Sequence, residues 1–197
     1  GDATANVIVA GQGDDVLDGN GGADVLYAAE GDDVLKISDT TFARVDGGSG
    51  NDKLVLDGSG ITLDLRTIAD NKLTGIETID LTGTGNNTLV VSSLEVLNLS
   101  DTSNSLTVKG EAEDIVLIGP QWTFGPRTQV AGNNQPTRFT DGAAELLVYG
   151  PRIGLYLPEG SGPWTISLDG TDLLFTDGTL TTRLPKKLTE EILIRGS

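Results

Sequence analysis

Four aspartates recur at one position of four nine-residue units, and their type and spacing point to chemistry. The units AGQGDDVLD, GNGGADVLY and AAEGDDVLK follow one another over 10–36, and GGSGNDKLV covers 47–55. In every unit position four is glycine, position eight is leucine and position six is aspartate, namely Asp15, Asp24, Asp33 and Asp52. Stacked carboxylates repel one another unless a cation lies between them. Because loop carbonyls add further oxygens, the pattern indicates sites for a hard cation.

The composition excludes most other chemistry. The 197 residues include no Cys, Met or His, so thiolate nucleophiles, disulfides, zinc fingers and imidazole bases are absent. The chain has 13 Lys+Arg against 29 Asp+Glu, a net charge of −16, which argues against a nucleic-acid partner. No apolar run is long enough to predict a transmembrane helix. Starting at Gly1 without an initiator Met, the chain is expected to be a fragment of a longer protein.

Each unit predicts a tight turn followed by a very short strand. Its glycine-rich first part can adopt positive φ angles, and the residues after it place a leucine inward. Two units make one coil, and stacking the coils buries a column of leucines. The same stacking places one aspartate-containing loop on another.

These units resemble the repeats-in-toxin (RTX) nonapeptide, G-G-x-G-x-D followed by x, an apolar residue and x. The resemblance implies an all-β, right-handed parallel β-roll that binds Ca²⁺ between loops two units apart. Each ion would take the aspartates of both loops and backbone carbonyls of the glycine-rich positions. The chain departs from the pattern at Ala10 and Ala28 in the first position, and at Asn20 and Ala29 in the second. Carbonyl ligands survive these changes.

Counting units places three intact loops, 10–15, 28–33 and 47–52, on one side of the roll. The step from position 28 to position 47 is longer than two units by one, so we expect an inserted residue near Ile37 or Ser38, with Val45 inward in a degenerate unit. Two Ca²⁺ sites follow, one between Asp15 and Asp33 and one between Asp33 and Asp52. By the resemblance, the carbonyl ligands come from Ala10, Gly11, Gln12, Gly13, Ala28, Ala29, Glu30, Gly31, Gly48 and Gly50.

The opposite side has one intact loop, 19–24. Asn6 ends the loop before it, so a further site is expected between Asn6 and Asp24, whereas Ala43 ends the loop after it and offers no ligand. Farther along, 83–87 (GTGNN) has Asn87 in the aspartate position, for which an asparagine-rich turn is the alternative to an ion site. Residues 1–58 hold 12 acids and 3 bases, a density that favours folding only with counterions.

The rest of the chain predicts a β-solenoid with a C-terminal β capping region. We expect three parts: the β-roll at 1–58, further solenoid rungs at 59–119 and the cap at 120–197. The rungs are short β segments with no helix before 119, and 76–81 (IETIDL) and 94–99 (LEVLNL) are interpreted as the same rung in successive coils. In the last part, five more β segments are expected at 145–150, 153–158, 164–170, 171–178 and 179–184.

Bulky residues and one helical pattern mark that last part. Its aromatic residues are expected in a cap or core, with a sugar-stacking surface as the alternative; they are Trp122, Phe124, Phe139, Tyr149, Tyr156 and Trp164. The tail 184–197 is the best helix candidate, because Leu188 and Ile192 have the i, i+4 spacing of one helix face.

The function expected from this pattern is a calcium-binding structural module of a secreted or cell-surface bacterial protein. The middle of the chain is similar in texture to adhesin-like and S-layer-like proteins, which implies adhesion or surface assembly, with other surface proteins or further copies as partners. The alternative is an accessory, glycan-binding or stabilising module of a secreted, calcium-dependent polysaccharide-active enzyme. Catalysis by this chain is not expected, because it has neither G-x-S-x-G nor H-E-x-x-H.

Overall fold

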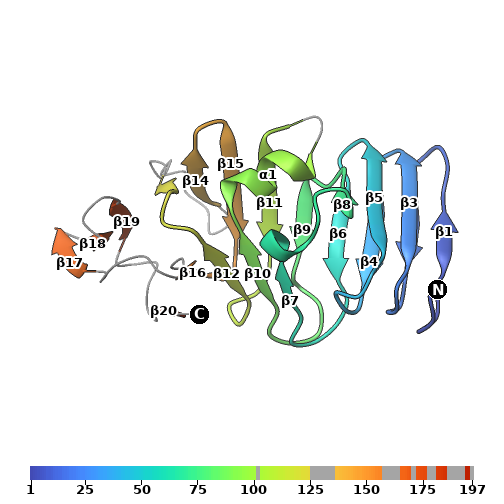
Figure 1. Cartoon of the computed structure of the whole chain (residues 1–197), viewed down its shortest axis with the longest axis horizontal. Coiled ribbons are helices and arrows are strands. Elements are labelled where there is room, and N and C mark those ends of the chain that lie inside the picture. The colour runs from blue at the N-terminus through green and yellow to red at the C-terminus, as the bar shows by residue number, and fades with distance from the viewer. Residues whose placement is uncertain are drawn as a thin grey trace.

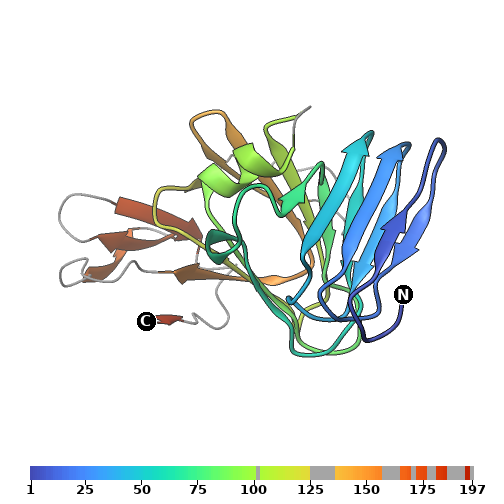
Figure 2. The same cartoon turned by 45° about the vertical axis from the view of Figure 1, so that its right-hand side comes forward.

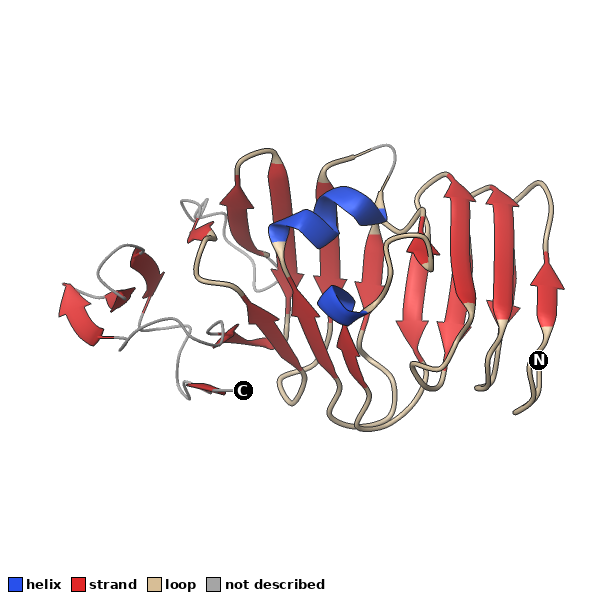
Figure 3. Ribbon diagram, in the orientation of Figure 1, coloured by secondary structure: helices blue, strands red, loops and turns tan. Residues whose placement is uncertain are grey.

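The structure is a computed structural model that describes residues 1–100, 103–124, 136–156, 165–169, 172–176, 181–185 and 194–195. This part of the chain is mostly strands, with one α-helix and one short 3-10 helix (Figure 3). The molecule is elongated, with the N-terminus near one end and strands β17 to β19 at the other (Figure 1). Among the helices of the described residues, none could span a membrane.

The described residues form four sheets, which mix parallel with antiparallel pairing. Sheet A is parallel: β1 (Val7–Val9), β3 (Val25–Glu30), β5 (Arg44–Ser49) and β8 (Leu73–Thr74). Sheet B is parallel through β2 (Val16–Asp18), β4 (Val34–Ile37), β6 (Lys53–Leu56), β9 (Thr78–Asp80), β11 (Ser105–Lys109) and β15 (Ala144–Tyr149), and ends in antiparallel β14 (Thr137–Asp141) and β13 (Thr123–Phe124).

The other two sheets lie later in the chain. Sheet C is parallel: β7 (Thr62–Asp64), β10 (Thr88–Val91), β12 (Ile115–Ile118), β16 (Arg152–Tyr156) and β20 (Ile194–Arg195). Sheet D is antiparallel: β17 (Thr165–Asp169), β18 (Asp172–Thr176) and β19 (Thr181–Pro185).

Up to β6 the chain alternates between sheets A and B. The register confirms the two-unit coil, because Leu17 pairs with Leu35, and it confirms the insertion, because Leu35 pairs with Leu54. On sheet A, Leu26 pairs with Val45, and both side chains are buried as expected. All four unit leucines are also buried. Since the step from Leu35 to Val45 is the longer one, the extra residue lies between β4 and β5.

From β7 onward the chain visits sheet C between sheets B and A, which the sequence did not indicate. The order becomes β7 in sheet C, β8 in sheet A and β9 in sheet B, so Leu54 pairs with Ile79 after a longer excursion of the chain. In sheet C, Leu89 pairs with Leu63 before it and with Val116 after it. Each coil is longer here because the chain must form a third side. The fold widens from the blue strands to the green ones (Figure 2).

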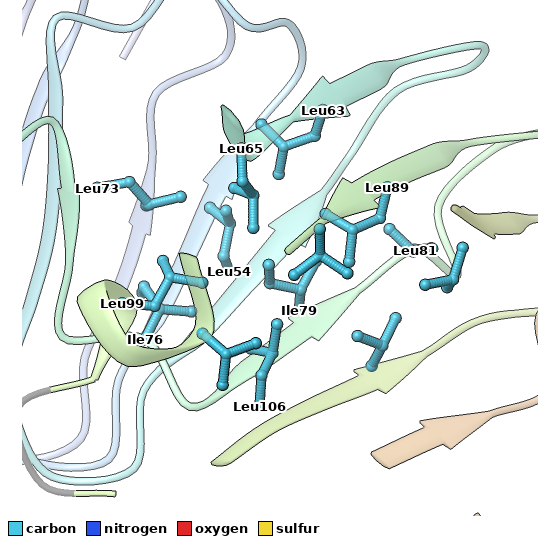
Figure 4. Close-up of a cluster of buried hydrophobic side chains, with 14 of the residues drawn as sticks. Leu54, Leu63, Leu65, Leu73, Ile76, Ile79, Leu81, Leu89, Leu99 and Leu106 are labelled. Carbon is cyan, nitrogen blue, oxygen red and sulfur yellow. The ribbon is translucent and has the colours of Figure 1, made fainter. Parts of the chain in front are cut away.

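The interior is one continuous apolar cluster, which runs from Leu17 to Leu155. Figure 4 shows its middle part, where side chains from sheets A, B and C and from the helix point toward one another. Leu54, Ile79 and Val108 pair in register on successive strands of sheet B and are fully buried. Burial of a leucine, isoleucine or valine contributes about 1.5–3 kcal/mol, so this column holds neighbouring coils together.

The strand expected at 94–99 is wrong, and with it the expectation of no helix before 119. Residues Ser93–Leu99 form α1, which occupies the place in the chain order where the next strand of sheet A would come and contacts β8, β11 and β15. Ser92 is the N-cap, and its hydroxyl accepts the Glu95 N–H at 3.4 Å. Val96 and Leu99 are buried on one face, whereas Leu94 is 61% exposed. A second helix, η1 (Leu65–Thr67), follows β7.

The expected β segments after 144 are present as β15 to β19. Trp122 and Phe139 are buried, which favours a cap or core over a sugar-stacking surface for these two, and Phe124 meets Phe139 edge-on at 5.6 Å between ring centroids. The side chains of Tyr156 and Trp164 lie outside the described residues. So do Leu188 and Ile192 of the expected tail helix, while Ile194–Arg195 in the same segment is strand β20.

Candidate calcium sites

A ladder of carboxylates links the sixth-position residues of successive loops. The Asp15 N–H donates to Asp33 Oδ1 at 2.7 Å, and the Asp33 N–H donates to Asp52 Oδ1 at 2.9 Å. The ladder continues past the repeats, because the Asp52 N–H donates to Glu77 Oε2 at 2.8 Å. One oxygen of each acceptor is therefore used to join two loops, as the stacking predicted.

The second carboxylate oxygens of Asp33 and Asp52 have no partner. Asp33 and Asp52 are 1% and 0% exposed, and the Oδ2 atom of each is buried without a hydrogen bond. An unpaired buried carboxylate oxygen is costly, since it has lost its water and gained no donor. These two oxygens have the properties expected of atoms that coordinate a cation. Asp15, at the start of the ladder, is half-buried, and its Oδ2 accepts only a long hydrogen bond of 3.4 Å from the Gly11 N–H.

The loops that should supply carbonyls are stacked as the unit count predicted. Gly13 donates to the Glu30 carbonyl at 2.8 Å and Gly31 to the Ser49 carbonyl at 3.0 Å. At Gly31 the φ angle is +143°, and a Cβ there would overlap the Gly13 carbonyl oxygen. The backbones therefore approach as closely as only glycine permits.

Asn20 and Ala29, which replace the second glycine, keep the glycine-like backbone. Their φ angles are +60° and +87°. Ala29, a predicted carbonyl ligand, therefore keeps the backbone conformation that glycine has at this position of the repeat. Gly11 and Glu30 already accept backbone hydrogen bonds through their carbonyls, and the second lone pair of each oxygen is left for a ligand.

Electrostatics at Asp52 also fit a cation. Burial is the main cause that raises the pKa of Asp52, and repulsion by the carboxylates of Glu77, Asp33 and Asp32 adds to it, so that the pKa is about 6. The hydrogen bond from the Asp33 N–H opposes this rise. A divalent ion would replace the lost hydration and cancel the repulsion.

A second ladder, on the fifth position, was missed by the sequence reasoning. The Asp32 N–H donates to Asp14 Oδ1 at 2.9 Å, and the Asn51 N–H donates to Asp32 Oδ1 at 2.8 Å. These bonds run from the later coil to the earlier one, opposite to the sixth-position ladder. Asp14 and Asp32 are exposed, so they tie the loops together in contact with water. The doubled acids of the repeat therefore have two different roles.

On the opposite side, Asn6 and Asp24 are brought together. The Asn6 N–H donates to Asp24 Oδ1 at 2.8 Å, and Asp24 is buried. The sequence reasoning found no ligand in the loop after Asp24, but Asp39 reaches back, because its Oδ2 accepts the Gly22 N–H at 3.3 Å. The Thr41 side chain and N–H hold the pKa of Asp39 low. An Asp-x-Thr turn is the signal that could have identified Asp39.

In sheet C the same ladder position is occupied by Asn87, and here the interaction network is complete. Asn87 Oδ1 accepts the Ile61 N–H at 2.9 Å, and the Asn87 N–H donates to Asp114 Oδ1 at 2.8 Å. Its Nδ2 donates to the carbonyls of Gly58 at 3.0 Å and Leu81 at 3.2 Å. The amide thus supplies the positive partner that carbonyls elsewhere would find in an ion, which favours the asparagine-turn alternative at 83–87.

The acidic side chains alone cannot enclose an ion. Within the described ranges, no group of three or more acidic side chains is arranged to hold a metal. A calcium site here would therefore combine one or two carboxylates with loop carbonyls, which is the ligand set that the RTX resemblance implies.

Comparison with known families agrees with this geometry. Residues 1–35 match the family model of the RTX calcium-binding nonapeptide repeat (4 copies). RTX repeats bind Ca²⁺. Searches of the curated proteins and of the solved structures found no match.

The matched range begins earlier than the four units recognised in the sequence. Residues 1–9 form a further unit, because Val7–Val9 pairs in register with Val25, Leu26 and Tyr27, one coil later. The unit 47–55 lies beyond the RTX match, yet it continues the ladder through Asp52. The assignment of individual calcium ligands stays a prediction.

The raised pKa of Asp52 predicts that the calcium-free fold loses stability as the pH rises, and that calcium then stabilises the fold by a larger amount. Because the folded pKa of about 6 exceeds the reference 3.8, proton binding stabilises the calcium-free fold below pH 3.8, and this contribution is lost as the pH rises through 6. In chelator, the thermal midpoint should fall between pH 5 and pH 7.5. The rise caused by calcium should be larger at pH 7.5. Asp52→Asn should flatten the step in chelator, and a wild-type midpoint that rises over this range would contradict the assignment.

The Asn87 network predicts that an aspartate there is harmful without calcium. Asn87→Asp loses both bonds donated by Nδ2 and buries a charge against two carbonyls, so unfolding in chelator should cost about 3 kcal/mol less. Calcium should restore part of that loss. Urea titrations with and without calcium measure both effects, with Asn86→Asp, an exposed neighbour, as the control. Equal effects of the two variants would show that the buried amide has no special role.

Proposed function

We propose that this chain is a calcium-dependent structural module in which ion binding completes the fold of the RTX coils. The observation that carries the proposal is the pair of buried, unpartnered oxygens, Asp33 Oδ2 and Asp52 Oδ2. Asp15, Asp33 and Asp52 form the ladder along which the two expected sites lie. The proposed architecture is a right-handed parallel β-roll at 1–58, continued by wider solenoid coils at 59–119 and closed by the region 120–197.

Folding of this module is coupled to the charge of its ladder. Without a counterion, Asp33 and Asp52 bury like charges within one hydrogen-bonded stack, and this opposes closure of the loops. Bound Ca²⁺ supplies two positive charges and accepts oxygen ligands, so its binding free energy becomes folding free energy. The leucine column then packs because the loops can close.

The setting we propose is the outside of a bacterial cell. RTX repeat proteins are generally secreted by bacteria. Extracellular calcium modules bind at about 10⁻⁴–10⁻³ M, a level that the cytosol does not reach. The chain would therefore stay unfolded before export and become rigid afterwards. In this proposal it serves adhesion or surface assembly, with other surface proteins or further copies as partners, and it performs no catalysis itself.

Two adjacent aspartates provide a matched test. In Asp33→Asn the amide oxygen can still accept the Asp15 N–H, but the free anionic oxygen is lost. We expect calcium affinity to fall at least about tenfold, as removal of one charged ligand predicts. Asp32→Asn changes the same charge on an exposed residue and should alter affinity less than about twofold. Isothermal titration calorimetry at constant ionic strength separates the two, and equal effects would contradict a site at Asp33.

A groove on the outer face of sheet B favours a second candidate function, glycan binding by an accessory module. The groove has a volume of about 590 Å³ and is lined by Thr78, Thr82, Thr107, Lys109, Gly110, Tyr149 and Gly150. Threonine hydroxyls, a half-buried tyrosine ring and an exposed lysine together suit a sugar, including an acidic one.

Polysaccharide binding in calcium tests this candidate. Affinity electrophoresis against acidic and neutral polysaccharides should show retardation that Tyr149→Ala abolishes. Tyr27→Ala, which removes a ring from the outer face of sheet A, should leave it unchanged. Retardation that is the same in both variants, or none for wild type, would leave only the structural role.

A further inference from the structure

The carboxylate ladder extends one coil beyond the recognised repeats, to Glu77. Lys53 pairs with Thr78, so Glu77 stands at the register position of Asp52 in the next coil of sheet B. Its Oε2 accepts the Asp52 N–H at 2.8 Å, as Asp52 Oδ1 accepts the Asp33 N–H at 2.9 Å. Glu77 therefore replaces a ladder aspartate, although no glycine-aspartate unit precedes it.

The free oxygen of Asp52 lies beside Gly47, at a point where the next coil comes close. A Cβ built on Gly47 would lie 2.6 Å from Asp52 Oδ2 and would overlap the Gly75 carbonyl oxygen. Asp52 Oδ2 and the Gly75 carbonyl thus face the same small region beside Gly47. Asp52 is fully buried, and this oxygen has no hydrogen-bond partner.

The backbone of the following loop is built for close approach. Gly75 has a φ angle of +62°, and a Cβ there would lie 2.6 Å from the Gly48 nitrogen. Asp46 pairs with Thr74 and Lys53 with Thr78, so the loop 47–52 is matched by the much shorter loop 75–77. A glutamate is one methylene longer than aspartate, and its reach compensates for the shorter loop.

We propose a further calcium site between the loops 47–52 and 75–77, formed by Asp52 Oδ2, the Glu77 carboxylate and the Gly75 carbonyl oxygen. The inference rests on the proposed calcium function and adds a third site to the two expected on this side. Glu77 and Asp52 repel each other, which an ion here relieves. Because β7 starts the third sheet between these two loops, this ion joins the two-sheet coils to the three-sheet coils.

Calcium stoichiometry of the full chain tests the site. Bound ions are counted by equilibrium dialysis and by native mass spectrometry, and folding is checked by circular dichroism in saturating calcium. Glu77→Gln keeps an oxygen for the Asp52 N–H but removes the charge, so it should bind one ion fewer than wild type. Glu113→Gln, an exposed glutamate in a later loop, should bind the wild-type number. An unchanged count for Glu77→Gln would overturn the site.

Two comparisons keep the outcomes distinct. If wild type binds no calcium, the proposed function itself fails; if Asp33→Asn loses ions and Glu77→Gln does not, only the site at Glu77 fails. If Glu77→Gln does not fold, Glu77→Asp is tested in its place. Glu77→Asp retains the negative charge, but its shorter side chain holds the carboxylate farther from Asp52. That variant should weaken one site about tenfold in calorimetry, since a ligand is displaced, and wild-type affinity at every site would overturn the inference.

Discussion

The hydrogen bond from a loop N–H to a carboxylate of the next coil is the interaction on which this structure depends. It fixes the sixth-position side chain, so that one oxygen joins two coils and the other remains buried without a donor, as in Asp33 and Asp52. The apolar column favours stacking of the coils, whereas the buried like charges oppose it. In the proposed function a cation resolves this conflict, and the acidic residues are dense in the two-sheet coils.

The transition to three sheets changes the ladder but keeps its geometry. Each side of a three-sheet coil is still about as long as one nine-residue unit. The side chain of the residue before the strand still accepts an N–H from the previous coil, as at Glu77 and Asn87. In sheet C that position holds Asn87, whose amide donates to two carbonyls and satisfies its own network. In the proposed function, stability depends on ions in the two-sheet coils and on the Asn87 amide network in the three-sheet coils, along a single continuous core. The acidic residues are concentrated in the two-sheet coils, because 12 of the 29 acids but only 3 of the 13 bases lie within 1–58.

Much of the RTX part could be predicted because its signals are local and periodic. The spacing of Leu17, Leu35 and Leu54 was enough to locate the coils and the inserted residue. The third sheet could not be predicted, because its strands look like those of sheets A and B and only pairing across the fold separates them. LEVLNL alternates like a strand, but Ser92 and Glu95 cap it as a helix. Glu77 and Asp39 were missed because they lie outside the repeat pattern.

Hydrogen exchange followed by mass spectrometry, with and without chelator, is the most direct test of the central claim that calcium holds the two-sheet coils while the amide network holds the three-sheet coils. The account predicts that removal of calcium abolishes amide protection in β2 to β6 (16–56) and leaves it in β10 and β12 (88–118). Equal protection of 16–56 in calcium and in chelator would contradict it.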